Sequence, residues 1–131
     1  MRALDTNVLV RFVTGDDSPQ AERVRALFRS AEEGHERLFV PLPVTLELIC
    51  VLTSSYETPK PAIVETLKHL LGLSYLRFEH VARIQALLAG AEQSPTGLSD
   101  LMVALSAREN GCTTTLTFDR RTARSPFFSA L

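Results

Sequence analysis

The sequence predicts an α/β fold, because short strand-like segments alternate with helical ones along the chain. Segments typical of strands occupy residues 2–4, 38–40, 76–78 and 113–117. Apolar residues at helical spacing occupy residues 8–14, 18–34, 44–55, 60–71, 81–91 and about 99–110. Parallel strands need such helical crossovers, which cover both faces of the sheet. With 131 residues, 45 % of them apolar, we expect one domain over residues 1–131.

Glycine and proline mark the boundaries of these elements. Gly15 ends the first helix, and Ser18-Pro19 begins the second with a capping hydroxyl and a proline at the first helical position. Pro43 opens the third helix, and Thr58-Pro59 separates it from the fourth. Asn110-Gly111 is a normal end for the last helix.

Charge and cysteine content give only general indications. A net charge of −1 disfavours a nucleic-acid binder, although basic residues can still gather on one face. Cys50 and Cys112 are isolated in apolar surroundings, so we expect both thiols to be reduced and buried. Reduced thiols in turn favour a cytoplasmic protein. A strand directly after Met1 leaves no room for a signal peptide. The charge-poor residues 38–56 include Pro41 and Glu47, which favours a buried strand and helix over a membrane span.

Asp5 lies between the first strand and the first helix. That position places its carboxylate at the carboxyl edge of the expected sheet, where open α/β proteins bind ligands. A simpler interpretation is that Asp5 caps a helix starting near Asn7. The two roles are compatible, because a cap uses only one carboxylate oxygen.

Glu47 is the only charged residue between Arg37 and Glu57. Its helix is apolar on nearly all sides, so we expect the helix to be buried. A buried carboxylate is costly unless it is paired or coordinates a metal. The alternatives are therefore a metal site and a salt bridge to a nearby arginine.

Asp100 and Asp119 complete a set of four acids in comparable settings. Asp100 lies at or near a helix N-terminus, where the helix dipole alone favours an acid. Asp119 follows the last predicted strand, where an ordinary turn also explains it. Because the exits of parallel strands share one edge of a sheet, we expect the four carboxylates to converge.

Converging carboxylates need a cation, because they would otherwise repel and raise each other's pKa. Oxygen-only ligands suit Mg²⁺ or Mn²⁺ rather than zinc. Such a site can position water for attack on a phosphodiester, which predicts phosphodiester hydrolysis. Thr6, Asn7 and Thr117 are candidates for orienting the carboxylates or binding phosphate, with turn formation as the alternative role.

The motifs around these acids resemble those of the PIN domain family, in particular the VapC toxins of bacterial toxin–antitoxin pairs. The likeness rests on four motifs in this order: Leu4-Asp5-Thr6-Asn7-Val8-Leu9-Val10-Arg11, Leu46-Glu47-Leu48, Ser99-Asp100-Leu101-Met102 and Thr117-Phe118-Asp119-Arg120. The resemblance implies a three-layer α/β/α sandwich with a central parallel sheet of four to five strands. It also implies a Mg²⁺-dependent endoribonuclease, a homodimer, and inhibition by a cognate VapB-type antitoxin.

By the same resemblance, Asp5 and Asp100 are the most direct metal ligands. Glu47 and Asp119 complete the catalytic acidic site, acting through water or a second metal. The chain departs from the family pattern at Ser99, where many relatives have alanine, and no acid follows Asp119. The missing acid leaves the number of metal ions open.

An RNA substrate would need basic groups near the acids. The candidates lie close in sequence to Asp5 or Asp119: Arg11, Arg120, Arg121 and Arg124. Solvated surface charge is the alternative role for each of them. The three histidines are scattered, and we assign them no catalytic role.

Three other functions stay open. A nuclease with the same acidic site could act on other RNA or on DNA, outside a toxin–antitoxin pair. A phosphotransferase with Asp5 as nucleophile usually needs a second Asp two residues on, where this chain has Asn7, and no glycine-rich phosphate loop is present. The third alternative is a non-catalytic binding module that keeps the fold.

Overall fold

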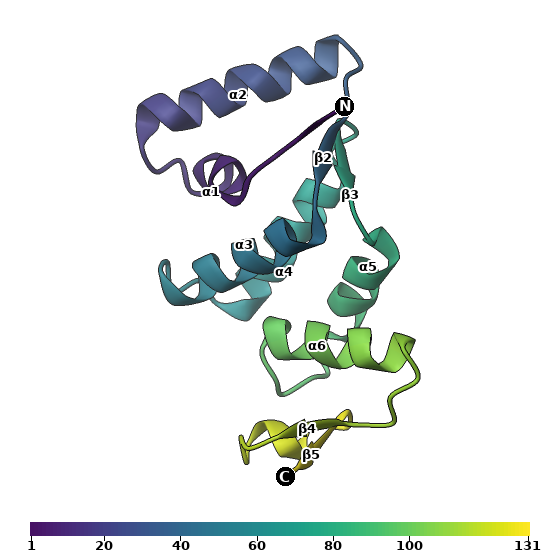
Figure 1. Ribbon diagram of the computed structural model, residues 1–131. Coiled ribbons are helices and arrows are strands. Elements are labelled where there is room, and N and C mark those ends of the chain that lie inside the picture. The colour runs from purple at the N-terminus through teal and green to yellow at the C-terminus, as the bar shows by residue number, and fades with distance from the viewer. The chain divides into compact units, whose positions relative to one another are not determined.

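The computed structural model describes residues 1–131 and divides them into two compact units, Met1–Glu79 and His80–Leu131. The elements of the first unit are β1 (Arg2–Ala3), α1 (Thr6–Thr14), α2 (Ser18–Glu33), β2 (Leu38–Val40), α3 (Leu42–Ser54), α4 (Lys60–Leu71) and β3 (Leu76–Phe78) (Figure 1). Those of the second are α5 (Val81–Gly90), α6 (Leu98–Glu109), β4 (Thr115–Thr117), the 3-10 helix η1 (Thr122–Arg124) and β5 (Phe128–Ala130). The alternation of strands and helices predicted from the sequence is confirmed.

A three-stranded parallel sheet in the order β1-β2-β3 organises the first unit. Leu38 on the central strand β2 pairs with Arg2 on one side and Leu76 on the other. The chain crosses from β1 to β2 through α1 and α2, and from β2 to β3 through α3 and α4. Leu38 and Val40 are completely buried, as expected for a central strand of a parallel sheet.

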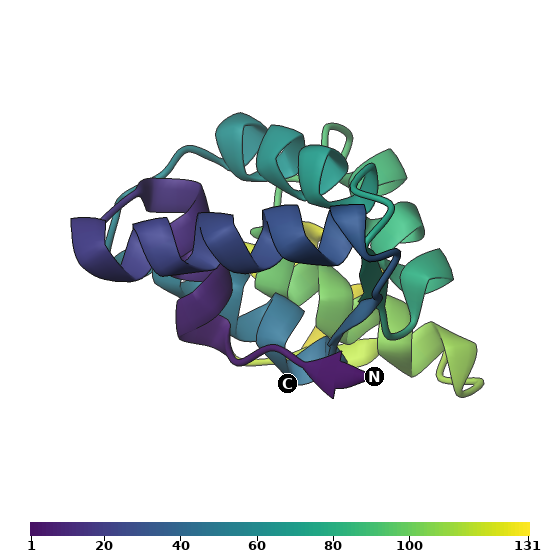
Figure 2. The same ribbon diagram turned by 90° about the horizontal axis from the view of Figure 1, so that it is seen from above.

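The helices of the first unit pack against one another. α1 contacts α2 and α3, and α3 contacts α4. Both views of the ribbon show α2 crossing over α1 near the N-terminal end of α2 (Figures 1 and 2). The Phe28 ring of α2 lies between those of Phe12 and Tyr75, with centroid distances of 4.6 and 5.3 Å. This aromatic cluster ties α2 to α1 and to the segment that leads into β3.

The ends of α1 and α2 depend on residues with special backbone geometry. Gly15 follows α1 with φ of 69°, in the left-handed region that glycine adopts without steric cost. Asp17, and not Ser18, caps α2, because its carboxylate accepts a hydrogen bond from the Gln20 amide at 3.3 Å. Ser18 is instead the first residue inside the helix, which moves Pro19 to the second helical position.

The second unit pairs α5 with α6 and places β4 beside β5 in a two-stranded parallel sheet. The sequence indicated neither η1 nor β5. The expected central sheet of four to five strands has only three, because β4 and β5 form a separate two-stranded sheet. None of the helices combines the length and the apolar character needed to cross a membrane.

Both cysteines are exposed, so the prediction of buried thiols was wrong. Cys50 lies three residues after Glu47 on α3, and this spacing puts both residues on the same exposed side of the helix. Cys112 lies in the exposed turn that follows α6. Beside Cys50 the apolar residues Leu48, Ile49 and Leu52 are buried in the core while the cysteine is not.

Candidate active site

Asp5 is the N-cap of α1. Only Leu4 separates it from the end of β1. Its φ and ψ of −85° and 163° are extended, and its Oδ1 accepts a hydrogen bond from the Thr6 amide at 2.8 Å. The side chain is exposed, and this cap leaves Oδ2 for another ligand. The capping role predicted from the sequence is confirmed, and it is compatible with cation binding.

Thr6 connects the Asp5 region to α3. Its side chain is only 5 % exposed, and its Oγ1 donates a hydrogen bond to Glu47 Oε2 at 2.7 Å. Two acids that are remote in sequence therefore bond to the same residue, Asp5 to the Thr6 amide and Glu47 to the Thr6 hydroxyl. The bond fixes the Glu47 carboxylate and leaves its Oε1 for a ligand.

Glu47 itself is exposed, so the sequence argument from the cost of burying it was wrong. One side of α3 is buried through Val44, Leu48 and Ile49, while the opposite side carries Glu47. Most residues of α3 are apolar, yet one side of the helix is exposed to solvent. The alternative role in a salt bridge is not seen either, because the partner of Glu47 is Thr6.

Asp100 lies in the first turn of α6 and is exposed. The N-cap of this helix is Gly97, which has no side chain to accept a bond from the first amides. A negative charge in this turn interacts favourably with those amides and with the helix dipole. Asp100 therefore stabilises the start of α6, and its exposure keeps the carboxylate accessible to a ligand.

Asp119 follows β4 by two residues and holds the turn that leads into η1. Its Oδ1 accepts a hydrogen bond from the Thr122 amide at 2.9 Å, and its own amide donates to Thr117 Oγ1 at 3.1 Å. The bond from the Thr122 amide, helped by that of Arg121, lowers the pKa of Asp119 below its usual value. The side chain is therefore ionised at neutral pH.

The two units divide the four carboxylates into pairs, with Asp5 and Glu47 in the first and Asp100 and Asp119 in the second. Neither unit by itself contains a group of three or more His, Cys, Asp or Glu side chains that could hold a metal ion. The structure thus brings Asp5 and Glu47 together through Thr6. The convergence of all four acids stays a prediction.

The remaining candidate residues differ in their surroundings. Thr117 accepts the bond from Asp119, which is the turn role weighed as its alternative. Asn7 is exposed and Arg11 half-buried, and both line a pocket between α1 and α2. The other basic candidates, all in the second unit, are exposed: Arg120, Arg121 and Arg124.

The sequence interpretation missed Gln20 and Arg23, which line the same pocket from α2. Their spacing contained the necessary information, because residues 20, 23, 24 and 27 recur on one face of a helix.

The donor groups of the four acids fit a hard divalent cation. Asp5 and Glu47 offer exposed carboxylate oxygens, and neither forms an ion pair that would neutralise it. Neither unit gathers the Cys and His ligands that zinc prefers. The residues therefore suit Mg²⁺ or Mn²⁺ better than a softer metal.

The chain is similar to known proteins over almost its whole length. Residues 2–127 match the family described as PIN domain, a range that includes all four carboxylates. The chain is also 26 % identical over 121 residues to a VapC ribonuclease from Aquifex aeolicus (strain VF5), an alignment that covers 92 % of this chain and 89 % of that protein. Since the family match extends over almost the whole sequence, the chain belongs to the PIN domain family.

Proposed function

We propose that this protein is a Mg²⁺- or Mn²⁺-dependent endoribonuclease and the toxin component of a VapBC-type module. The observation that carries the proposal is the first turn of α1, where Asp5 caps the helix and Thr6 orients Glu47. Membership of the PIN domain family and the similarity to a VapC ribonuclease support the same activity. In this proposal residues 1–131 act as a single domain, in the cytoplasm.

The proposal gives each acid a role in holding the cation and the attacking water. Asp5 and Asp100 are its direct ligands, and Glu47 and Asp119 complete the site. When bound, the cation supplies positive charge that favours ionisation of water and offsets charge on the leaving oxygen. Thr6 would hold Glu47 in place through Oε2, which leaves Oε1 for the cation or its water.

The overall reaction is hydrolysis of an RNA phosphodiester. A water oxygen forms a bond to phosphorus, the bond from phosphorus to one ribose oxygen breaks, and that oxygen takes up a proton. Arg11 and the basic residues after Asp119 would offset the negative charge of the substrate backbone. Asn7 and Thr117 lie next to the acids in sequence and are suited to bind phosphate oxygens.

The proposed toxin would act as a homodimer and bind a VapB-type antitoxin, as its similarity to a VapC ribonuclease suggests. A direct test is to produce the chain together with the protein encoded by a short neighbouring reading frame. The proposal predicts a complex in which RNA cleavage is suppressed. If the neighbouring protein neither binds nor inhibits, the assignment to a toxin–antitoxin pair is wrong.

Activity is tested by incubating the chain with labelled single-stranded RNA and with DNA of the same sequence, with and without Mg²⁺. We expect cleavage of RNA that requires Mg²⁺ and disappears in Asp5→Asn, whereas the control Glu33→Gln, an exposed acid on α2, cleaves like the wild type. Equal cleavage of DNA would favour a nuclease of broader substrate range. Absence of any cleavage would favour a binding module and contradict the proposal.

A further inference from the structure

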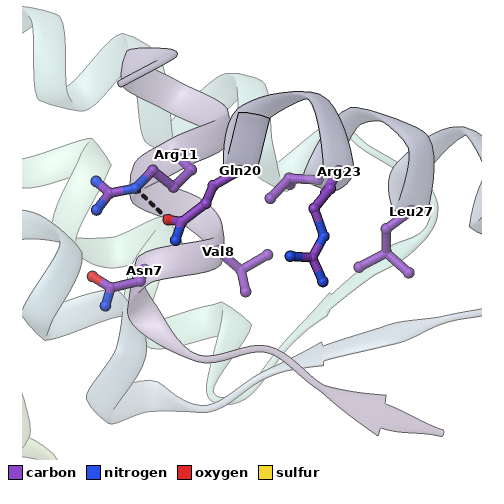
Figure 3. A pocket seen from close by; sticks show the side chains of 7 residues that line it. Asn7, Val8, Arg11, Gln20, Arg23 and Leu27 are labelled. Carbon is purple, nitrogen blue, oxygen red and sulfur yellow. Dashed lines mark hydrogen bonds between the residues drawn. The ribbon is translucent and has the colours of Figure 1, made fainter. Parts of the chain in front are cut away.

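A pocket of about 380 Å³ lies between α1 and α2 in the first unit (Figure 3). Its volume is in the range of about 300–1,000 Å³ that is usual for small-ligand sites. The lining side chains are Asn7, Val8, Arg11, Gln20, Arg23, Val24 and Leu27. Figure 3 draws Asn7 near one end of this set and Leu27 near the other. Residues of both helices therefore line the pocket, three from α1 and four from α2.

The charge of the pocket favours an anionic ligand. Two guanidinium groups line it, those of Arg11 and Arg23, and no carboxylate does. Arg11 Nε donates a hydrogen bond to the neutral amide of Gln20 at 2.9 Å, and Arg23 forms no ion pair. By contrast, Arg25 on the same helix pairs with Glu22 at 2.8 Å.

The charge of Arg11 also interacts with Asp16, which lies outside the lining. The carboxylate of Asp16 is held mainly by Tyr56, whose hydroxyl donates to Oδ2 at 2.8 Å, and the charge of Arg11 contributes least to its lowered pKa. No carboxylate of the lining therefore neutralises the two guanidinium groups. Guanidinium forks match the geometry of phosphate oxygens, which makes phosphate the best-suited anion.

The lining also has an apolar part. Val8, Val24 and Leu27 supply aliphatic surface from both helices. A ligand that carries a phosphate next to a flat, weakly polar ring would satisfy both parts of the pocket. A nucleotide has this composition, with its phosphate for the guanidinium groups and its base for the aliphatic side chains.

The pocket is connected to the candidate acids through three consecutive residues of α1. Asp5 caps the helix, Thr6 bonds to Glu47, and Asn7 lines the pocket. A polynucleotide whose phosphate lies at the acids would therefore place a neighbouring nucleotide within reach of the pocket. This continuity favours RNA over an acidic peptide as the occupant.

We propose that this pocket binds a nucleotide of the RNA substrate adjacent to the scissile phosphate. The guanidinium groups of Arg11 and Arg23 lie on opposite sides of Val8 (Figure 3) and bind the phosphates on either side of this nucleotide. Val8, Val24 and Leu27 contact its base, and Asn7 lies on the side toward the acids. The inference rests on the proposed ribonuclease function. It adds a substrate subsite made by α1 and α2 to the acidic residues.

Binding is measured without cleavage, by fluorescence anisotropy of a labelled single-stranded RNA oligonucleotide in EDTA at several salt concentrations. Arg23→Ala should weaken binding by roughly threefold to tenfold and lower the salt dependence by about 0.7 in log–log slope, since one phosphate contact is lost. The control Arg29→Ala removes an exposed arginine of α2 that does not line the pocket, and it should leave both quantities unchanged.

A second variant adds a negative charge to the pocket without shortening any side chain. Gln20→Glu places a carboxylate against Arg11 and should also weaken RNA binding. Its control is Gln85→Glu, which makes the same change of net charge on the exposed side of α5. Circular dichroism of all four variants should match the wild type, because all four substituted side chains are exposed.

The pocket and the proposed function can fail separately. If Arg23→Ala and Gln20→Glu bind RNA as tightly as their controls, or if the wild type does not bind RNA, the nucleotide subsite is refuted, whether or not RNA is cleaved. If binding depends on Arg23 but no metal supports cleavage, the subsite stands and the ribonuclease proposal fails. Binding of a polyglutamate peptide that depends on Arg23, with RNA binding unaffected, would assign the pocket to an acidic partner instead.

Discussion

Replacing Thr6 by valine tests whether the hydrogen bond to Glu47 positions this carboxylate. Valine has nearly the shape of threonine and fits a side chain that is only 5 % exposed, so the change removes the 2.7 Å bond with little change in packing. Hydrogen bonds to charged groups contribute about 1.5–3 kcal/mol, but the exposed Glu47 regains water, which reduces the expected loss of stability to about 1 kcal/mol or less.

The expected effect on activity is much larger than the effect on stability. Residues that orient a metal ligand typically contribute a factor of about 10–100 in metal affinity or activity. We therefore expect Thr6→Val to lower Mg²⁺-dependent RNA cleavage by roughly that factor and to raise the Mg²⁺ concentration needed for half-maximal rate. Thr6→Ser keeps the hydroxyl and should restore most of the activity.

The assay is initial-rate RNA cleavage over a range of Mg²⁺ concentrations, together with a thermal melt of each variant. Thr53→Val is a matched control, because Thr53 lies on the same helix as Glu47 and its hydroxyl bonds only to the Ile49 carbonyl, at 2.7 Å. If Thr6→Val and Thr53→Val cleave RNA alike, with the same Mg²⁺ dependence, Thr6 does not position Glu47 and the reasoning fails.

Three further predictions concern the acids and the metal. Asp5→Asn should abolish cleavage yet change the melting temperature little, because asparagine is also a good N-cap for α1. A large fall in melting temperature would contradict the capping argument. Removal of divalent ions by EDTA should abolish cleavage, and added Mg²⁺ should restore it. The far-ultraviolet circular dichroism should stay unchanged in EDTA, since buried apolar residues stabilise each unit. The pKa of Asp119 is lowered by the Thr122 amide, so its ionised form stabilises the fold above its unfolded pKa of about 3.9. This stability is lost as pH falls through the folded pKa, so the melting temperatures of wild type and Asp119→Asn should differ at pH 7 and converge in acid.

Local sequence patterns were sufficient to predict most of the elements. The limits of α4 and β3 agree with the predicted residues 60–71 and 76–78, because proline and apolar spacing define those segments locally. β5 could not be predicted, since its three residues, Phe128–Ala130, become a strand only by pairing with β4. A strand this short has no periodicity of its own.

The position of Glu47 shows where a sequence argument reached a useful residue for an incorrect reason. An apolar helix with one acid suggested burial and hence a need for compensation. The side of α3 that carries Glu47 is exposed, and the acid is held by a hydroxyl from another helix. No pattern within residues 44–55 encodes that partner, because the contact with Thr6 joins positions 41 residues apart.

The face of α2 that lines the pocket illustrates the opposite case, in which available information was not used. Gln20, Arg23 and Leu27 recur at helical spacing, but polar residues on a helix are usually solvated. Only the crossing of α1 over this face turns it into one wall of a pocket. The tertiary arrangement of two helices, and not their individual sequences, creates the anion-binding character of the site.

The helix α1 carries residues for both the proposed chemistry and the proposed substrate binding, and its helical periodicity directs them to different sides. Leu9 and Val10 are buried and fix the helix in the core, so that its other sides cannot rotate independently. Thr6 then reaches Glu47 on α3, while Asn7 and Arg11, four residues apart on one face, line the pocket toward α2. Because one rigid helix carries both groups of residues, a change that shifts α1 should impair metal dependence and RNA affinity together. A change confined to the α2 wall, such as Arg23→Ala, should affect RNA affinity alone.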